Sequence, residues 1–405
     1  MEKNVVPVTT VLMPAYYKDF HCLMGDCQDT CCTGWRIEFN KKDYLAIKRA
    51  PKSEELEELL GQGMRRLRER EHDGMYAEFL ARGEDHCTLQ SPEGLCRLQL
   101  ECGADTLPEV CKVFPRAAHW SMAARELSLS PACEGVLSLL WDLPEGIDFI
   151  EEPLEKKDFK NYVPLNPVAG RFTDIRSFCI DVLQERSLKL SQRMLFLGFV
   201  LQRLREADWE AEDTAEVWLA QSEALLHDPA LAHQLDQLPR NQAMFISNNY
   251  RVMAKVAQEG SSSANLAREL QSAVSEMVHK EDGQITFDGR VYQKLENKLD
   301  ELLGHSEYFF ENIMVTIFYH VMMPNLTDKE KMWEGYVNFC NLYSIYRFSA
   351  VCGCAGEVSR EQLFHVLVGI SRSLIHNVVR SNQLRDEFFQ HDSATLAHMA
   401  ILVGG

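Results

Sequence analysis

Cysteine placement constrains this chain more than any other feature of its sequence. Nine of the 13 cysteines in 405 residues lie between Cys22 and Cys133, and four fall within eleven residues, at Cys22, Cys27, Cys31 and Cys32. Structural cysteines are usually scattered through a core, whereas close thiols occur in disulfide frameworks, redox sites and metal sites. The N-terminal part of the chain is therefore predicted to be organised around its thiols.

The redox compartment decides between these uses. The first 14 residues hold one lysine and a short apolar stretch broken by Pro7 and Pro14, which does not match a secretory signal peptide. No run approaches the roughly 18 apolar residues of a membrane span. We therefore expect a cytoplasmic protein without a membrane segment, in which disulfides are rare and close thiols bind metal or perform redox chemistry.

Charge and composition exclude several classes of partner. Lys plus Arg number 42 and Asp plus Glu number 60, giving a formal net charge of −18. This balance argues against binding to a nucleic-acid backbone and against a polybasic membrane anchor. Hydrophobic residues at 46% and charged residues at 25% are typical of a globular chain, so we expect neither disorder nor a fibrous fold.

The sequence texture predicts a mostly α fold, in which a cysteine-rich N-terminal metal-binding module precedes an irregular α-helical bundle. Residues 1–142 form the cysteine-rich region, and a charged segment from Ser53 to Glu78 within it is typical of a solvated helix. Residues 143–170, rich in proline and acidic residues, are predicted to be a linker. Residues 171–405 show helical periodicity. Helices are expected from about Phe172 and over 191–206, 213–226, 242–258, 264–279, 290–303, 306–322, 328–346, 359–380 and 383–402.

The thiols fit a soft metal centre, but their spacing leaves its identity open. Thiolates suit zinc and iron–sulfur clusters alike, and adjacent Cys31 and Cys32 cannot easily bind one tetrahedral ion. The two-residue spacing of zinc ribbons is absent. Cys27 and Cys31 match the start of a radical adenosylmethionine loop, but Gly34 occupies the position of its third cysteine.

Motifs along most of the chain resemble the flagellin lysine-N-methylase family, within a broader group of zinc- or iron-chelating cysteine-cluster proteins. The N-terminal motifs are Pro14, Tyr16, Phe20, Cys22, Cys27, Asp29-Thr30-Cys31-Cys32, Gly34-Trp35, Cys87, Gly94-Leu95-Cys96, Gly103, Cys111, Phe114-Pro115-Arg116 and Glu126 to Glu134. The helical motifs are Arg176, Leu183-Gln184, Arg186, Phe310-Glu311-Asn312, Pro324, Ser371-Arg372 and His376-Asn377. Thr88-Leu89-Gln90 departs from the family pattern. This difference concerns the geometry of the loop after Cys87 more than metal ligation.

The resemblance implies an S-adenosylmethionine-dependent methyltransferase that modifies lysines of flagellin and requires a [4Fe-4S] cluster, with zinc as the alternative metal. Carried over by position, the cluster ligands are drawn from Cys22, Cys27, Cys31, Cys32, Cys87, Cys96, Cys111 and Cys133. Cys102 is excluded, because the family has an apolar residue there. Cys179, Cys340, Cys352 and Cys354 are interpreted as packing residues.

Five polar residues are candidates for a cofactor pocket, although no catalytic residue is identified. Arg116 follows a cluster motif and has the chemistry to hold a carboxylate such as that of adenosylmethionine. Glu311, Asn312, Arg372 and His376 interrupt apolar helices, where packing hydrogen bonds are the alternative interpretation. A glycine-rich adenosylmethionine turn of the Rossmann type is absent.

A second function class remains open on sequence grounds. The chain would then be a non-catalytic protein-interaction module, with a structural zinc site needed only for folding. The oligomeric state also stays open, a homo-oligomer being one option.

Overall fold

The computed structural model describes residues 10–34, 36–68, 75–82, 86–121, 125–153, 161–162, 171–238, 240–258, 262–281 and 284–404. Trp35 of the first cysteine motif, and residues 154–160 and 163–170 of the predicted linker, lie outside this set. The described residues contain seventeen α-helices and several short strands. A mostly α-helical chain is therefore confirmed, and the strands are an addition to the prediction.

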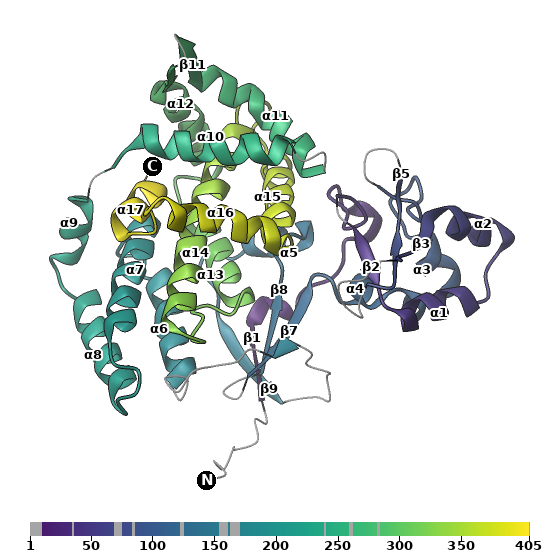
Figure 1. Ribbon diagram of the computed structural model, residues 1–405, viewed down its shortest axis with the longest axis horizontal. Helices are drawn as coiled ribbons and strands as arrows, with labels where there is room; N and C mark the ends of the chain where they lie inside the picture. Colours follow the sequence, from purple (N-terminus) through teal and green to yellow (C-terminus); the bar gives the residue numbers. More distant parts are fainter. Residues whose placement is uncertain are drawn as a thin grey trace.

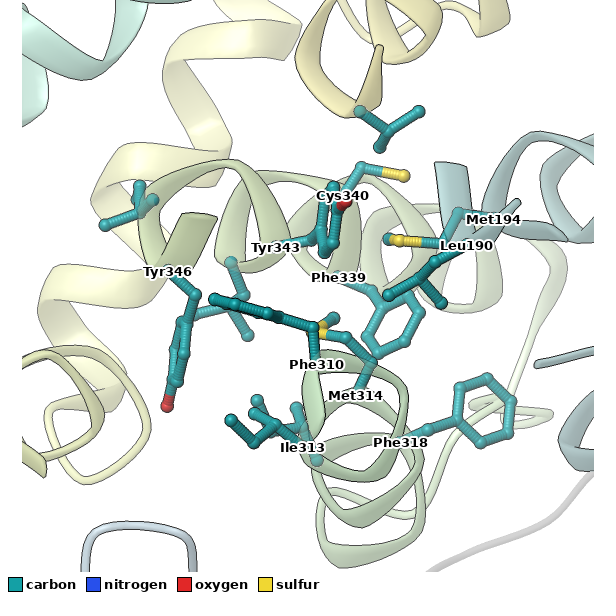
Figure 2. Packing of buried hydrophobic residues seen from close by; sticks show 14 of the residues in the cluster. Leu190, Met194, Phe310, Ile313, Met314, Phe318, Phe339, Cys340, Tyr343 and Tyr346 are labelled. Carbon is teal, nitrogen blue, oxygen red and sulfur yellow. The ribbon is translucent and has the colours of Figure 1, made fainter. Parts of the chain in front are cut away.

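Two apolar helices form the centre of the larger body (Figure 1). Every residue of α13 from Phe309 to Tyr319 is buried, and α14 packs against α7, α10, α11, α12 and α15 to α17. Figure 2 shows Phe310 and Met314 of α13 gathered with Phe339 of α14 and Met194 of α7. Removing such a large apolar surface from water is the main stabilising contribution to this body.

The other helices surround this centre. The helices of the body are α5 (Glu134–Trp141), α6 (Phe172–Leu183), α7 (Leu190–Glu206), α8 (Thr214–Leu226), α9 (Leu231–Asp236), α10 (Gln242–Gln258), α11 (Ser262–Met277), α12 (Gly289–Leu302), α13 (Tyr308–His320), α14 (Lys329–Gly353), α15 (Arg360–Leu374), α16 (Val378–Gln390) and α17 (Leu396–Val403). A hairpin of β11 (Val278–Glu281) and β12 (Gln284–Phe287) projects from it. None of the helices described is long and apolar enough to cross a bilayer.

A five-stranded sheet joins the N-terminal region to the helices. Its order is β10-β7-β8-β1-β9, formed by β1 (Thr10–Pro14), β7 (Arg116–Trp120), β8 (Arg125–Leu129), β9 (Phe149–Pro153) and β10 (Asn161–Tyr162). Strand β1 pairs in parallel with β8 and antiparallel with β9. Buried Arg176 of α6 donates to Glu126 of β8 (2.8 Å) and to the Tyr319 carbonyl of α13 (2.7 Å). This ion pair ties the sheet to the helical centre.

A small lobe whose core includes or contacts five cysteines lies at one end of the molecule (Figure 1). It contains a three-stranded sheet of order β2-β4-β3 and a short β5-β6 pair. The lobe comprises β2 (Ile37–Phe39), α1 (Lys41–Arg49), α2 (Glu54–Gly63), β3 (Met64–Arg66), β4 (Ala77–Phe79), β5 (Ala81–Arg82), β6 (His86–Cys87), α3 (Arg97–Cys102) and α4 (Glu109–Val113). Ile47, Leu56, Leu60 and Leu98 are fully buried in its own core.

The hydrophobic cores divide the chain at different places from the predicted boundaries. Tyr16, Phe20, Leu129 and Val136 belong to the large helical core, although all four precede residue 142. Strand β9 falls inside the predicted linker and pairs with β1 along its full length. Part of the sheet thus belongs to the large helical core, the lobe has a second core, and Val11, Met13 and Leu127 of the sheet form a small third one.

Several predicted helices are wrong in extent. The helix predicted over 383–402 is broken at 391–395 between α16 and α17, and α14 runs to Gly353 instead of ending at 346. The segment predicted as helical from Ser53 to Glu78 leaves the helix at Gly63 and continues into β3, and Glu78 lies buried on β4. The helix predicted over 359–380 ends at Leu374, and α16 begins afresh after Asn377, whose side chain accepts from the Arg380 N–H. Side-chain capping of this kind competes with helix continuation.

Candidate functional site

The eight predicted ligand cysteines fall into two groups in different surroundings. We call Cys32, Cys87, Cys96 and Cys111 the lobe cysteines, because all four belong to or contact the core of the small lobe. The Cys87 N–H donates to the Cys32 carbonyl (2.7 Å), and Gln90 forms a β-bridge with Cys96. Backbone pairing therefore brings together Cys32 and Cys87, which are 55 positions apart in the sequence.

The lobe cysteines influence one another electrostatically. Burial raises the pKa of Cys87 to about 12, and the neighbouring Cys32 and Cys96 thiols raise it as well. Burial and then the proximity of Cys32, Cys96 and Cys87 raise the pKa of Cys111 above its usual range. A hydrogen bond with Cys31, followed by burial, raises the pKa of Cys32. The raised pKa values keep these thiols protonated when no cation is nearby. A bound metal cation would lower the pKa values and favour the thiolate form.

The other four lie where the lobe meets the helical body. We call Cys22, Cys27, Cys31 and Cys133 the junction cysteines. Cys133 is the residue before α5, and the first residue of that helix, Glu134, accepts from the N–H groups of Gln28 and Asp29 (both 2.8 Å). The Cys27 thiol also donates to Glu134 (3.3 Å). A carboxylate at a helix N-terminus is favourably placed, and here it fixes the loop that carries Cys27.

Arg372 of α15 connects this loop to the helical body. Its guanidinium donates to the carbonyls of Asp29 (2.5 Å), Thr33 (3.3 Å) and Ala132 (3.4 Å). Burial lowers its pKa, while Asp29 and the thiols of Cys31, Cys27 and Cys133 act in the opposite direction. His365, two turns earlier on α15, contacts the Asp29 carboxylate through Nδ1 (2.7 Å). The prediction had grouped Arg372 with pocket residues, and the structure places it against the cysteine loops.

All thirteen cysteines are free thiols, and the two groups are not closed around one ion. Within the described ranges, no three His, Cys, Asp or Glu side chains are arranged so that they could hold a single metal ion. The remaining cysteines have ordinary roles. Cys102 donates to the Pro51 carbonyl (3.4 Å), and Cys179, Cys340, Cys352 and Cys354 are buried in helices or at their ends. Ligation by the eight predicted cysteines stays a prediction.

Three other predicted site residues make packing contacts. The Arg116 guanidinium lies 4.8 Å from the Phe20 ring centre and donates to the Phe20 carbonyl (3.4 Å). Glu311 is buried between Arg186 (2.8 Å) and Arg193. The Asn312 amide donates to the carbonyls of Leu140 and Leu143 at the end of α5. Glu311 and Asn312 thus join α13 to its neighbours.

His376 belongs to a histidine cluster that the sequence did not indicate. Its Nε2 lies 2.7 Å from Ser130 Oγ, and its ring centre is 6.4 Å from that of His320 at the end of α13. His320 in turn lies 6.2 Å from His119 of β7 and contacts Ser128 Oγ through Nδ1 (2.9 Å). The three histidines are 56 to 257 positions apart, so no local spacing could have grouped them.

These observations define a class of protein, a helical body that fixes a thiol-rich lobe through a partly buried arginine and a helix N-terminus. The chain belongs to the FliB lysine N-methylase C-terminal domain family, whose model matches residues 176–402. That range covers more than half of the chain and includes Arg176, Glu311, Arg372 and His376.

Individual relatives agree with this assignment. The chain is 29% identical over 177 residues to proteins named lysine-N-methylase from Salmonella choleraesuis and Salmonella typhimurium, and the match covers 43% of the chain and 42% of each relative. It is 31% identical over 157 residues to the flagellar biosynthetic protein FliU of Salmonella muenchen, covering 38% of the chain and 87% of that protein. The match thus spans less than half of the two lysine-N-methylases. No solved structure matches the chain.

Proposed function

We propose that this protein is a protein-lysine N-methyltransferase that acts on flagellin in the cytoplasm, with S-adenosylmethionine as methyl donor. The observation that carries the proposal is the match of residues 176–402 to the lysine N-methylase domain. The likeness to a flagellar biosynthetic protein supports flagellin as the substrate class. A net charge of −18 suits a lysine-bearing protein substrate, because opposite charge steers association.

The reaction places two demands on the chain, a neutral lysine amine and an in-line arrangement of donor and acceptor. The lysine nitrogen attacks the methyl carbon with its lone pair, while the carbon–sulfur bond breaks and leaves its electrons on sulfur. Lysine, with a pKa near 10.4 in water, must therefore lose its proton to water or to a protein acceptor before transfer. Donor and acceptor must also be held in line at near-attack distance. A neutral amine is favoured where burial or a nearby cation disfavours the ammonium form.

We further propose that cysteines hold a [4Fe-4S] cluster, with zinc as the alternative metal. The chemistry of the donor set fits, because eight thiols in two groups offer soft ligands. The junction cysteines are the favoured cluster ligands, since Cys27, Cys31 and Cys133 interact with the Arg372 guanidinium and Cys22 interacts with Cys133. A bound cluster would supply a redox-active iron centre. No step of methyl transfer is assigned to it.

A structural metal role is the second candidate, and the lobe cysteines favour it. Their positions inside the small core are those expected of a metal that stabilises the fold. On this alternative the chain is a protein-interaction module without catalysis, and a homo-oligomer remains open for either function.

The deciding experiment incubates the protein, purified without oxygen, with adenosylmethionine and purified flagellin. Mass spectrometry of flagellin peptides should show the mass increment of methyl groups on lysines. Cys27→Ser should remove that product together with the iron–sulfur absorption, while Cys102→Ser serves as the matched control and keeps both. Flagellin that stays unmodified with metal-loaded wild-type protein would contradict the enzymatic proposal. Stoichiometric zinc without an iron–sulfur signal would contradict the cluster.

A further inference from the structure

A cavity lies in the helical body, apart from all of the cysteines. It is bounded by α10, α16 and α17 and has a volume of about 300 Å³. Small-molecule sites typically begin at about this size and combine apolar walls with a few placed polar groups. None of the residues discussed so far lines it. Its chemistry therefore requires an explanation of its own.

The wall between α16 and α17 is held in shape by the backbone. Helix α16 ends at Gln390, and Asp392 adopts a left-handed φ of 51°. The Ser393 N–H donates to the Phe388 carbonyl (2.7 Å), and the indole N–H of Trp333 donates to the Ala394 carbonyl (2.9 Å). This turn is thus tied to both α16 and α14. A preformed wall reduces the ordering that a ligand must impose on binding.

Helix α10 presents polar groups to the cavity. The Asn248 amide nitrogen is buried and has no hydrogen-bond partner. Arg251, one turn further along the same face, lines the cavity and makes no hydrogen bond or ion pair with any other residue that the structure describes. A buried donor without a partner is unfavourable, so a ligand acceptor there would be stabilising. The exposed guanidinium nearby has the fork geometry that binds a carboxylate.

The facing wall supplies an apolar surface and a negative charge. Phe388 and Leu384 of α16 line the cavity together with Leu402 of α17. Glu387, which also lines it, forms an ion pair with Lys255 of α10. An aromatic ring and aliphatic side chains suit a planar heterocycle, and the carboxylate suits a cationic group. The combined wall chemistry fits a small ligand with a planar ring, a carboxylate and a positive charge.

We propose that this cavity is the S-adenosylmethionine site of the protein. Arg251 would bind the ligand carboxylate, Asn248 would donate to a ligand acceptor, and the apolar wall would hold the purine against Phe388. Glu387 would face the positively charged amino acid and sulfonium part. This inference rests on the proposed function, which supplies adenosylmethionine as the ligand of this chemical class.

The cavity lies apart from the small lobe and its cysteines. In Figure 1, α17 and the C-terminal half of α16 lie on the side of the helical body away from the small lobe, and the N-terminal end of α10 lies on that side too. A ligand in the cavity would therefore not contact the lobe cysteines.

Calorimetric titration of the full chain with S-adenosylhomocysteine, the unreactive product, tests the inference directly. Arg251→Gln should weaken binding about tenfold or more, because a charge-assisted hydrogen bond is lost. Ser247→Trp, which fills the cavity from the α10 side, should abolish binding. Arg203→Gln is the matched control, an exposed arginine on α7 that should leave the affinity unchanged. Thermal unfolding of each variant confirms that it is folded.

The outcomes separate the site from the function. Wild-type affinity in both folded cavity variants would overturn the location, while methylation of flagellin by the wild type would leave the proposed function intact. Wild-type protein that binds neither adenosylmethionine nor its product, and methylates nothing, would overturn both. Binding of ATP in the cavity without binding of adenosylhomocysteine would overturn the ligand assignment.

Discussion

The charge of Glu311 is enclosed more completely than that of most carboxylates in this protein. Its side chain is 1% exposed, and it accepts from Arg186 at the surface and from Arg193, which is 2% exposed. Burying the charges of Glu311 and Arg193 is unfavourable by itself, and their mutual attraction offsets the desolvation only while both are present. The same contacts join α7 and α13. Glu311 thus stabilises the packing of α13 against α7.

Glu311→Gln should destabilise the fold by about 3–5 kcal/mol, because Arg193 would remain buried without its full counter-charge. Chemical denaturation followed by circular dichroism measures this loss. Glu330→Gln is the matched control, since its ion pair with Arg205 is exposed and is expected to contribute less than about 1 kcal/mol. Equal effects of the two substitutions would refute the role given to the buried pair.

His320 should make stability depend on pH. Burial, and then the charges of His376 and His119, lower its pKa to about 3. Below the ordinary histidine pKa of about 6.5, the unfolded chain takes up a proton that the folded chain refuses, so stability falls as pH drops from about 6.5 towards 3. The contribution of His320 to the change in unfolding free energy with pH should approach about 1.4 kcal/mol per pH unit.

Replacing the ring tests this coupling. His320→Asn removes the titrating group, so the unfolding free energy of the variant should depend on pH less steeply than that of the wild type over the same range. Denaturant titrations at several pH values measure this dependence. His305→Asn is a suitable control, because His305 is exposed and asparagine tolerates its φ of 55°. A His320→Asn slope equal to that of the wild type would argue against the assigned pKa.

At the scale of elements, apolar periodicity was sufficient to predict most of the helical body. Helix α10 runs over 242–258 as predicted, because its apolar residues repeat at helical spacing. The break between α15 and α16 was missed, since it depends on Asn377 capping a new helix and on His376 reaching Ser130, 246 positions away. Residues 64–66 and 77–79 form strands because β4 pairs with both β2 and β3, and pairing with other strands overrides local propensity.

The candidate site shows the same division. The cysteine clusters and Arg372 were identified from their residue types, but the separation into lobe and junction groups depends on backbone pairing that brings Cys87 to Cys32. The cavity was not predicted at all. Its lining comes from three helices, and Asn248 and Arg251 are unremarkable in the sequence without the facing wall.

Helices α7 and α14 approach closely at Gly198. A Cβ added there would overlap the hydroxyl end of Tyr336, which itself donates to the Met194 carbonyl (3.2 Å). Gly198→Ala should therefore destabilise the protein by about 1–3 kcal/mol through overpacking, although alanine favours helix. Thermal unfolding provides the measurement, and adding Tyr336→Phe should recover part of the loss. Gly61→Ala, with open space around the new methyl group, should be neutral or stabilising. Stabilisation by Gly198→Ala would contradict the close approach.

At the scale of the whole molecule, the chain has two main cores that are joined by few polar contacts. The small lobe has its own core, and the loop from Cys27 to Thr33 lies between that core and α15. Arg372 and Glu134 hold this loop from the helical side. The metal centre proposed here borders this loop, whereas the cavity is lined by residues of α10, α16 and α17, so we expect the two to respond to different substitutions.

Arg372→Ala tests the connection between the two parts. The substitution removes hydrogen bonds from a charged donor to Asp29, Thr33 and Ala132, each of which contributes about 1.5–3 kcal/mol when charge-assisted. Loop amides in 22–34 should then exchange with deuterium about tenfold faster or more, and Cys27 should react faster with a thiol reagent. The helical circular dichroism and the affinity for adenosylhomocysteine should stay at wild-type values, because neither depends on this contact.

Arg385→Ala is the control. It removes an arginine of α16 that is paired with Glu334 and Asp386, and it should leave loop exchange unchanged. Loop exchange that is equally slow in the wild type and in Arg372→Ala would show that another contact holds the cysteine loop to the helical body.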